Sequence, residues 1–482
     1  MVSVLSKMWK GEGGCGQVLK IALPLILSTS AMTIQLFVDR VFLMWFDREA
    51  MSAAMQAGIL NFVAFSFFLG TATYVNTFVS QYDGAGRANR IGAAIWQSIY
   101  FSIIAGFLMA GLYFVAKPLM TLVGHAESVR AYEITYYKIL VIGAMPGLIA
   151  ASMSCFYTGR GKTSVVMWVA ITRTVVNIIL DYALIFGNWN MPRLGMAGAA
   201  IATVISGVVA CLIYVVLFFA QKNRQDFATA SGWRFDTGLF TRLMRFGVPS
   251  GVQFMLDIFG FAMFIVFVGR IDAVSFAATS MACQINTLSF FPMIGFSIAT
   301  STLVGRELGR NRPDLAQRSA WSAAALTMTY MAIIAVGYWF LPQVFMYPFK
   351  SQADLAQFEA IRPIVENLLC FVAIYCIFDT GNLIFSAALK GAGDTFFVMV
   401  SATLLNWIVL VVPSYLAITF LKGHQRLYMS WLALTAYVSL LAILFLCRFL
   451  HGKWKTMRVI EMPVPTVPST MPAVPTIETE SI

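Results

Sequence analysis

The stretch that decides the fold is Gln17–Phe46, which reads QVLKIALPLILSTSAMTIQLFVDRVFLMWF. As a helix it is about 45 Å long, because each residue adds about 1.5 Å, and this length crosses a bilayer with some tilt. Pro24 lies near its start, and one acid, Asp39, lies well inside it. Since a carboxylate is costly in hydrocarbon unless it faces a polar interior, Asp39 is a candidate functional residue.

The composition supports a membrane protein. Of the 482 residues, 59% are hydrophobic and 11% are charged, whereas soluble domains carry about 25% charged residues. The net charge of +11 fits basic cytoplasmic loops better than nucleic-acid binding. The seven cysteines show neither a CxxC motif nor paired spacing, so no disulfide framework or metal site is indicated.

Twelve apolar runs are long enough to span a membrane. They cover residues 17–46, 52–80, 91–116, 132–156, 164–188, 195–221, 243–269, 273–305, 318–342, 362–388, 396–421 and 427–450. The predicted fold class is therefore all-α: a polytopic membrane protein with twelve transmembrane helices in two pseudo-symmetric six-helix lobes.

The two sets of six helices are related by an internal repeat. Residues 77–87 align with residues 302–312 at an offset of 225, and residues 159–163 align with residues 391–395 at an offset of 232. Six is an even number, so both halves start on the same side of the membrane and the repeat is parallel, about an axis along the membrane normal.

These observations predict five segments. They are a cytoplasmic N-terminal segment (1–16), an N-lobe (17–221), a cytoplasmic linker (222–242), a C-lobe (243–450) and a disordered, Pro/Thr-rich tail (451–482). With both termini on one side, and with residues near the end of a span counted on the nearer side, 21 Lys and Arg residues lie on that side and 11 on the other, and Arg173 alone lies deep inside a span. The positive-inside rule then predicts an integral inner (plasma) membrane protein with both termini in the cytoplasm.

Several polar residues fall inside the predicted spans: Asp39, Arg173, Asn177, Asp181, Asp257 and Asp379. Asn177 and Asp181 are four residues apart and share a helix face. By depth, Asp39 pairs with Asp181 in the outer half of the bilayer and Asp257 pairs with Asp379 nearer its middle, which predicts one acidic site in each lobe. By the repeat offsets the acids have no acidic counterparts, as expected of specialised sites. The alternatives are that they are structural carboxylates, and that Arg173 neutralises Asp39.

At these motifs the chain resembles the multidrug and toxic compound extrusion (MATE) transporters over residues 17–450. The resemblance is carried by Pro24 with Asp39, Gln81-Tyr-Asp-Gly-Ala-Gly, Asn177-Ile-Ile-Leu-Asp181-Tyr-Ala-Leu-Ile-Phe-Gly187, Gly195-Met-Ala-Gly-Ala-Ala-Ile-Ala-Thr203, Pro249 with Asp257, and Tyr375-Cys-Ile-Phe-Asp379. It implies a secondary antiporter that exports amphipathic, often cationic compounds by alternating access.

The resemblance also implies the sites. The N-lobe site for a cation or proton would consist of Asp39, Asn177, Asp181 and Thr203, and the C-lobe site of Asp257, Tyr375 and Asp379. Arg173 matches no family motif and is a possible modulator of the N-lobe site. The coupling ion would be Na⁺ or H⁺, with no cofactor and no other metal. The expected partners are small-molecule substrates and the lipid bilayer, and the protein is expected to be a monomer.

Other functions remain to be weighed against this one. A lipid-linked sugar flippase or another metabolite exporter of the same superfamily would need cavity cations for phosphate, and the sequence offers four acids against Arg173. A membrane enzyme would need a catalytic constellation, which the three histidines near loops do not provide. A nucleotide-driven pump is disfavoured because Phe156 stands where a phosphate-binding loop ending at Gly161 needs glycine.

Overall fold

The computed structural model describes residues 9, 11–123, 127–350 and 355–461. The first half contains α2 (Cys15–Phe46), α3 (Arg48–Thr73), α4 (Val75–Gly84), α5 (Ala88–Gly111), α6 (Ala116–Val123), α7 (Glu127–Ile142), α8 (Ala144–Thr158), α9 (Thr163–Phe186) and α10 (Met196–Phe218). The connection to the second half contains α11 (Gln221–Phe227) and the short turn η1 (Ser231–Trp233).

The second half contains α12 (Thr237–Gly269), α13 (Ala273–Gly309), α14 (Pro313–Phe340), α15 (Pro342–Lys350), α16 (Leu355–Ala392), α17 (Thr395–Leu405), the π-helical turn η2 (Asn406–Val411), α18 (Val412–Phe420), α19 (Gln425–His451) and the turn η3 (Lys453–Thr456). We call α2–α10 the first repeat and α12–α19 the second repeat.

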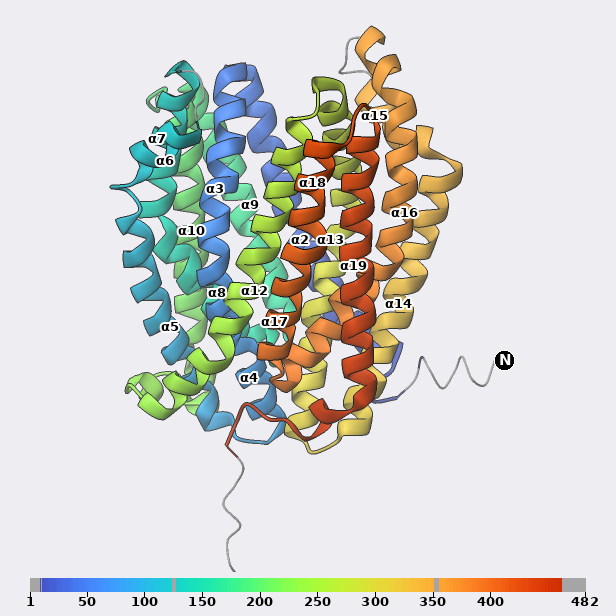
Figure 1. Ribbon diagram of the computed structural model, residues 1–482. Coiled ribbons are helices and arrows are strands. Elements are labelled where there is room, and N and C mark those ends of the chain that lie inside the picture. Colours follow the sequence, from blue (N-terminus) through green and yellow to red (C-terminus); the bar gives the residue numbers. More distant parts are fainter. Residues whose placement is uncertain (1–8, 10, 124–126, 351–354, 462–482) are drawn as a thin grey trace, which may run out of the picture.

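The described helices confirm a polytopic all-α membrane protein. Ten spans are long and apolar enough to cross a membrane when α3 with α4, and α17 with η2 and α18, are each counted as one, and two bent pairs raise the number to as many as twelve. One bent pair is α7 with α8, which meet at Gly143 with a bend of 46°. The other lies within α13, which bends by 44° between its two halves. Figure 1 shows the helices running side by side along one common direction.

The internal repeat is visible in the contacts between the halves. Gly84 of α4 packs so closely on the carbonyl oxygen of Arg306 in α13 that a Cβ atom there would collide with it, and Gly309 packs in the same way on the carbonyl oxygen of Gln81. Gly84 and Gly309 are 225 residues apart, and so are Gln81 and Arg306. One contact is therefore the symmetry-related copy of the other, as expected about a two-fold axis.

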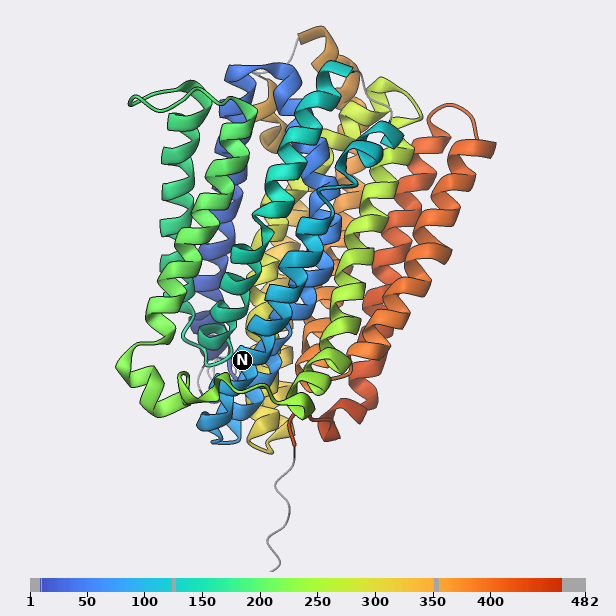
Figure 2. The same cartoon turned by 90° about the vertical axis from the view of Figure 1, so that its left-hand side faces the viewer.

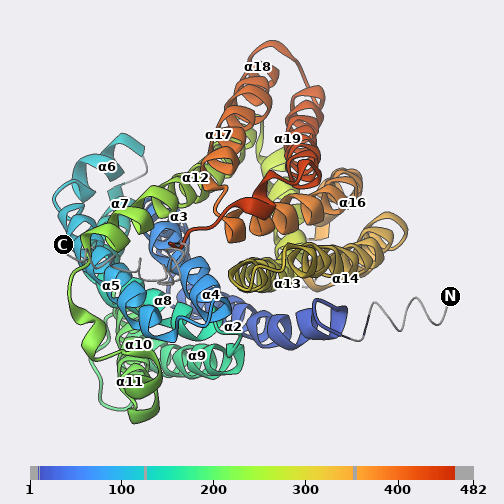
Figure 3. The ribbon, with the colours of Figure 1, turned by 90° about the horizontal axis from the view of Figure 1, so that it is seen from below.

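A second pair of contacts obeys the same symmetry. A Cβ atom on Gly70 of α3 would lie 3.0 Å from Cα of Gly251 in α12, and one on Gly295 of α13 would lie 2.9 Å from the backbone nitrogen of Ile26 in α2. Gly70 and Gly295, and likewise Ile26 and Gly251, are again 225 residues apart. The repeats therefore meet along α3 with α12 and along α2 with α13, which lie side by side in Figure 3.

The end of the bundle that is lowest in Figure 1 carries the start of α2 and the end of α19, and we call it the basal face. Polar contacts join the repeats there. Asn76 Nδ2 donates to Thr302 Oγ1 over 3.0 Å, and the Tyr74 hydroxyl donates to the carbonyl oxygen of Lys390 over 2.9 Å. Figure 2 shows the connection through α11 and η1 crossing the same face.

Two expectations from the sequence were wrong at this face. The span predicted to end at residue 388 continues as α16 to Ala392, which places Lys390 inside the helix. The tail expected to be disordered from residue 451 is packed as far as Glu461, because Trp454 and Val459 are buried and Glu461 forms ion pairs. Residues 462–482 of that predicted tail, and residues 1–8 and 10 of the predicted N-terminal segment, lie outside the described residues.

Candidate functional site

Three of the predicted N-lobe residues come together between α2 and α9, which pack against each other. Asn177 and Asp181 are both 0% exposed. With its amide nitrogen turned toward the acids, Asn177 donates to Asp39 Oδ1 over 3.0 Å and to Asp181 Oδ2 over 3.2 Å. The Asp39 and Asp181 carboxyl groups also lie within hydrogen-bonding reach of each other. We call Asp39, Asn177 and Asp181 the first-repeat cluster.

Two residues of this environment were not found from the sequence. Gln35 is buried, and its amide lies 3.0 Å from that of Asn177. It precedes Asp39 by four residues on α2, so the spacing on one helix face was the signal that could have identified it. Tyr136 of α7 interacts electrostatically with Asp39 and Asp181. Its position near these acids depends on how α7 packs against neighbouring helices, so no pattern in the sequence indicated it.

Arg173 and Thr203 are connected more loosely. The Arg173 guanidinium acts on Asp39 electrostatically, but among the described residues no ion pair within 4.0 Å joins the two. Its Nε atom is buried and has no hydrogen-bond partner there. Thr203 lies on α10, where its carbonyl oxygen accepts from Ser206 Oγ over 2.9 Å. For the part of the chain described, its side chain makes no hydrogen bond to the first-repeat cluster.

The second repeat holds Asp257 on α12 in a dense set of hydrogen bonds. Gln253 Nε2 donates to Asp257 Oδ2 over 2.6 Å, and the Tyr437 hydroxyl of α19 donates to Asp257 Oδ1 over 3.2 Å. The π-helical turn η2 adds Asn406, whose Nδ2 donates to the carbonyl oxygen of Leu256 over 3.2 Å. Such turns often accompany functional sites. Gln253 lies one turn from Asp257 on the same face, whereas Tyr437 and Asn406 carry no sequence signal.

Asp379 of α16 lies near enough to Asp257 for the two carboxylates to interact electrostatically. It is 7% exposed and accepts from Asn382 Nδ2 over 3.0 Å. Tyr375, one turn earlier on α16, is buried and interacts electrostatically with Asp379. The four residues Asp257, Asp379, Tyr375 and Tyr437 form what we call the second-repeat cluster.

Lys390 is the cation that the sequence did not place at this site. Its ammonium group interacts electrostatically with Asp257. Each cluster of acids therefore has a half-buried cation from its own repeat beside it, Arg173 in the first repeat and Lys390 in the second, and the exposed Arg40 also acts on Asp39. The described residues contain no group of three or more His, Cys, Asp or Glu side chains arranged to hold a metal ion. A monovalent cation or a proton is the chemistry that two acids with amide and hydroxyl neighbours can accept.

Known proteins resemble the chain over nearly its whole length. The family model MatE matches residues 24–183 and 249–416. "Probable multidrug resistance protein NorM" of Thermotoga maritima is 23% identical over 450 residues, which cover 92% of this chain and 94% of that protein. The protein of the same name from Bradyrhizobium diazoefficiens is 25% identical over 398 residues, covering 82% and 84% of the two chains.

Solved structures share the fold. An outward-facing multidrug resistance MATE family transporter of the MOP superfamily superimposes with a TM-score of 0.83 at 16% identity, covering 92% of this chain and 97% of that one. A MOP superfamily transporter from Pyrococcus furiosus, described as having a binding pocket of reverse polarity, gives a TM-score of 0.82 at 17% identity, with coverages of 94% and 98%. The family model matches well over half of the chain and includes all four acids of the two clusters. The chain therefore belongs to the MatE family, whose members are membrane transporters and not enzymes.

Proposed function

We propose that this transporter is a secondary antiporter that exports amphipathic, cationic compounds, driven by Na⁺ or H⁺ moving into the cell. The observation that carries the proposal is the presence of one pair of acids in each repeat, each pair held by helices of that repeat and made of one buried acid (Asp181 or Asp379) and one half-buried acid (Asp39 or Asp257). The names of the relatives from T. maritima and B. diazoefficiens, which refer to multidrug resistance, support a drug-like cargo.

Coupling would follow from competition for negative charge. Two carboxylates at hydrogen-bonding distance repel each other when both are charged, so a proton or a cation between them is favoured. Such an ion reduces the charge that can hold a cationic cargo. Export then requires that the inward-open and outward-open states differ in their affinity for the ion, which is the condition for alternating access.

The proposed topology follows the charge distribution. The basal face carries the contacts that join the repeats and would be the cytoplasmic face, as the positive-inside count favours. The lobes would be residues 17–221 and 243–450, which rock against each other about the repeat axis, and the protein would act as a monomer. The polar contacts of the basal face hold the repeats together in this structure, which favours an assignment to the outward-open side of the cycle.

Arg173 and Lys390 favour one alternative cargo. These two half-buried cations beside the acid clusters could bind the phosphate of a lipid-linked or otherwise anionic metabolite, so export or flipping of such a compound is the second candidate. The four acids outnumber these two cations, and the sign of the charge therefore favours cationic cargo.

The test is transport by the purified protein in proteoliposomes. Ethidium serves as the cationic cargo and a fluorescent short-chain anionic lipid as the rival cargo, with a Na⁺ gradient, a pH gradient or ATP alone imposed in separate experiments. We expect ethidium movement with one of the two ion gradients and none with ATP alone. Movement of the anionic lipid but not of ethidium would replace the proposal with the second candidate, and transport sustained by ATP alone would reject both.

A further inference from the structure

The chain after α19 is anchored first in the second repeat. The helix ends at His451, Gly452 caps it with a positive φ of 78°, and η3 then folds back on it. The Trp454 ring is 0% exposed and stacks on Phe449 with the ring centroids 4.8 Å apart. Its Nε1 donates to the carbonyl oxygen of Phe449 over 2.8 Å. Residues 452–456 are thereby fixed to α19.

The next five residues, 457–461, cross the basal face to the first repeat, and we call them the strap. Val459 is 1% exposed, and its side chain joins an apolar core to which α4, α5, α8, α9, α10 and the start of α12 contribute. Its backbone N–H donates to Gln81 Oε1 over 2.9 Å. On its other side Val459 lies against Gly393, in the turn that follows α16. The valine therefore fills a space that exists only while both repeats are in place.

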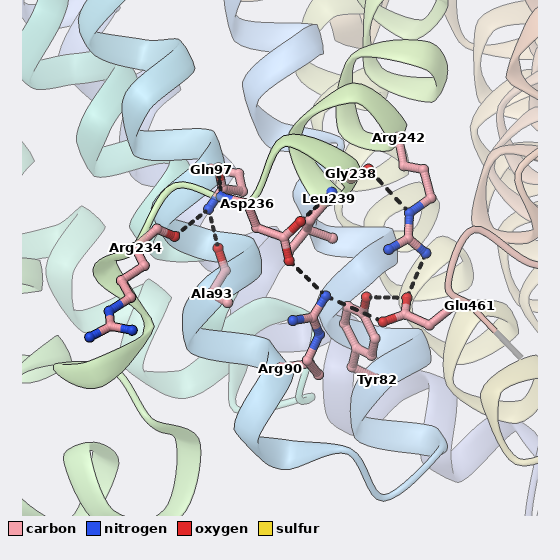
Figure 4. A network of polar contacts seen from close by, with 10 residues as sticks. All are labelled: Tyr82, Arg90, Ala93, Gln97, Arg234, Asp236, Gly238, Leu239, Arg242 and Glu461. Atoms are coloured by element: carbon pink, nitrogen blue, oxygen red, sulfur yellow. Dashed lines mark hydrogen bonds and ion pairs between the residues drawn. The ribbon is translucent and has the colours of Figure 1, made fainter. Parts of the chain in front are cut away.

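Glu461 ends the strap in a cluster of cationic and hydroxyl donors (Figure 4). Its carboxylate accepts from the Tyr82 hydroxyl over 2.7 Å and from Arg242 Nη1 over 2.5 Å, and it lies 3.3 Å from Arg90 Nη2. Arg87 Nη1 donates to the carbonyl oxygen of the same residue over 2.8 Å. Burial alone would raise the pKa of Glu461, but the hydrogen bonds from Arg242 and Tyr82 outweigh it and lower the pKa to about 2.

The network extends to the start of α12 and keeps its cations in place. Arg90 also pairs with Asp236 over 3.0 Å, and Asp236 caps α12 by accepting from the backbone amide of Leu239 over 2.9 Å. This amide hydrogen bond and the Arg90 guanidinium lower the pKa of Asp236, so both acids of the network stay charged.

Gln81 connects the strap to the contacts that close the basal face. It is 0% exposed, and while its Oε1 accepts from the strap, its Nε2 donates to the carbonyl oxygen of Gly391 in α16 over 3.0 Å. One side chain of the first repeat therefore holds both the end of α16 and the strap. A movement that separates α4 from α16 breaks the hydrogen bond to Gly391, and it also breaks the hydrogen bond to Val459 if the strap moves with the second repeat.

We propose that the strap is a latch that holds the basal face closed, and that residues 459–461 must leave the first repeat before the transporter opens at that face. This inference rests on the alternating access proposed above. The reach of the chain supports it: Trp454 and Val459 are five residues apart, so an extended segment between them spans at most about 17 Å. The strap cannot stay seated in both repeats while the basal ends of α4 and α16 move widely apart.

Hydrogen–deuterium exchange on the purified full-length protein tests the latch without any cargo. Exchange is followed in three regions: residues 455–461, which include the strap, residues 74–84, which include α4, and residues 300–309 at the basal end of α13. Glu461→Gln removes the charge that faces Arg242 and Arg90 and keeps the shape of the side chain. We expect it to raise the exchange rate in all three regions together by about two- to fivefold, the effect of losing a few partly exposed ion pairs.

Val459→Ala gives an independent variant, which shortens the apolar side chain and keeps every charge, and should raise exchange in the same three regions. The matched control is Glu127→Gln, because Glu127 pairs with Arg130 inside one helix at the opposite end of the bundle. This control should exchange like the wild type. Faster exchange confined to the strap, or unchanged exchange in both strap variants, would overturn the latch. Since exchange needs no transport, this result is separate from a failure to move ethidium.

Discussion

Ser80 of α4 and Gly305 of α13 contact each other although they occupy equivalent positions, 225 residues apart, in the two repeats. A residue that meets its own counterpart lies on the axis that relates the two copies. The pseudo-two-fold axis therefore passes between α4 and α13 at the basal face. The acid clusters lie off this axis, one in each repeat, so they could diverge while the shared contact surface was preserved.

The close packing on this axis leads to a stability prediction for Gly309→Ala. The added methyl group would collide with the carbonyl oxygen of Gln81, which is backbone and can give way only if α4 and α13 separate. We expect a loss of about 1–3 kcal/mol, typical of overpacking, measured as a lower midpoint of thermal unfolding in detergent.

Gly207→Ala in α10 is the matched control, since a Cβ atom there would meet nothing within 4 Å. Alanine is favoured over glycine inside a helix by up to about 1 kcal/mol, so this variant should be as stable as the wild type or more stable. Equal midpoints of thermal unfolding for the Gly309 and Gly207 variants would show that the close contact at Gly309 does not limit stability.

We predict that Asp257 and Asp379 of the second-repeat cluster couple transport to the ion gradient. Asp257→Asn and Asp379→Asn keep the shape of the side chain but remove the charge that a Na⁺ ion or a proton requires. We expect both variants to insert and bind ethidium, yet to lose gradient-driven efflux by about tenfold or more, as ion and cargo no longer compete for charge. Asp39→Asn should also impair export.

Asp314→Asn is the control for the same chemical change, because Asp314 is exposed in the first turn of α14. It should transport like the wild type. Full antiport by purified Asp257→Asn or Asp379→Asn protein, at the wild-type ion stoichiometry, would reduce these two acids to structural carboxylates.

We predict that replacing Arg173 changes how efflux depends on the ion, and does not simply lower the activity. It is the largest electrostatic influence of a cation on Asp39, so Arg173→Gln leaves the first-repeat cluster with one positive charge fewer nearby. We expect the Na⁺ or pH value that gives half-maximal efflux to shift by about tenfold or one pH unit, the effect of about 1.4 kcal/mol. Arg40→Gln removes an exposed neighbouring cation and should shift it less. Identical ion profiles for wild type and Arg173→Gln would reject a modulating role.

The strap should be insensitive to pH in the physiological range. Glu461 has a pKa lowered from 4.5 to about 2, so the folded state favours its charged form. The stabilisation by this charge is complete above the ordinary pKa and disappears only as pH falls through about 2. Exchange of residues 455–461, corrected for the intrinsic effect of pH, should therefore be the same at pH 6 and pH 8. If the corrected exchange rate instead changed with pH and had a midpoint between pH 6 and pH 8, a group other than Glu461 would control the strap.

The fold and the acids could be read from the chain because both depend on local pattern. Apolar length predicts the spans, the 225-residue offset predicts a symmetric pair of repeats, and four-residue spacing places Asn177 beside Asp181. The hydrogen-bonding and electrostatic partners of these acids could not be predicted in the same way. Tyr437, Asn406 and Lys390 reach the environment of Asp257 from other helices, and no periodicity along one helix specifies which face of another helix it meets.

The strap is the clearest case of a structure that local sequence patterns could not predict. Its composition resembles that of a disordered tail, since a short segment with prolines nearby shows no apolar period of its own. Val459 is nevertheless buried and Glu461 is paired, because α4, α5 and α12 contribute to an apolar site and bring Arg242 and Arg90 to one point. Burial of a single valine and pairing of a single glutamate depend on surfaces that exist only after the two repeats have folded and packed against each other.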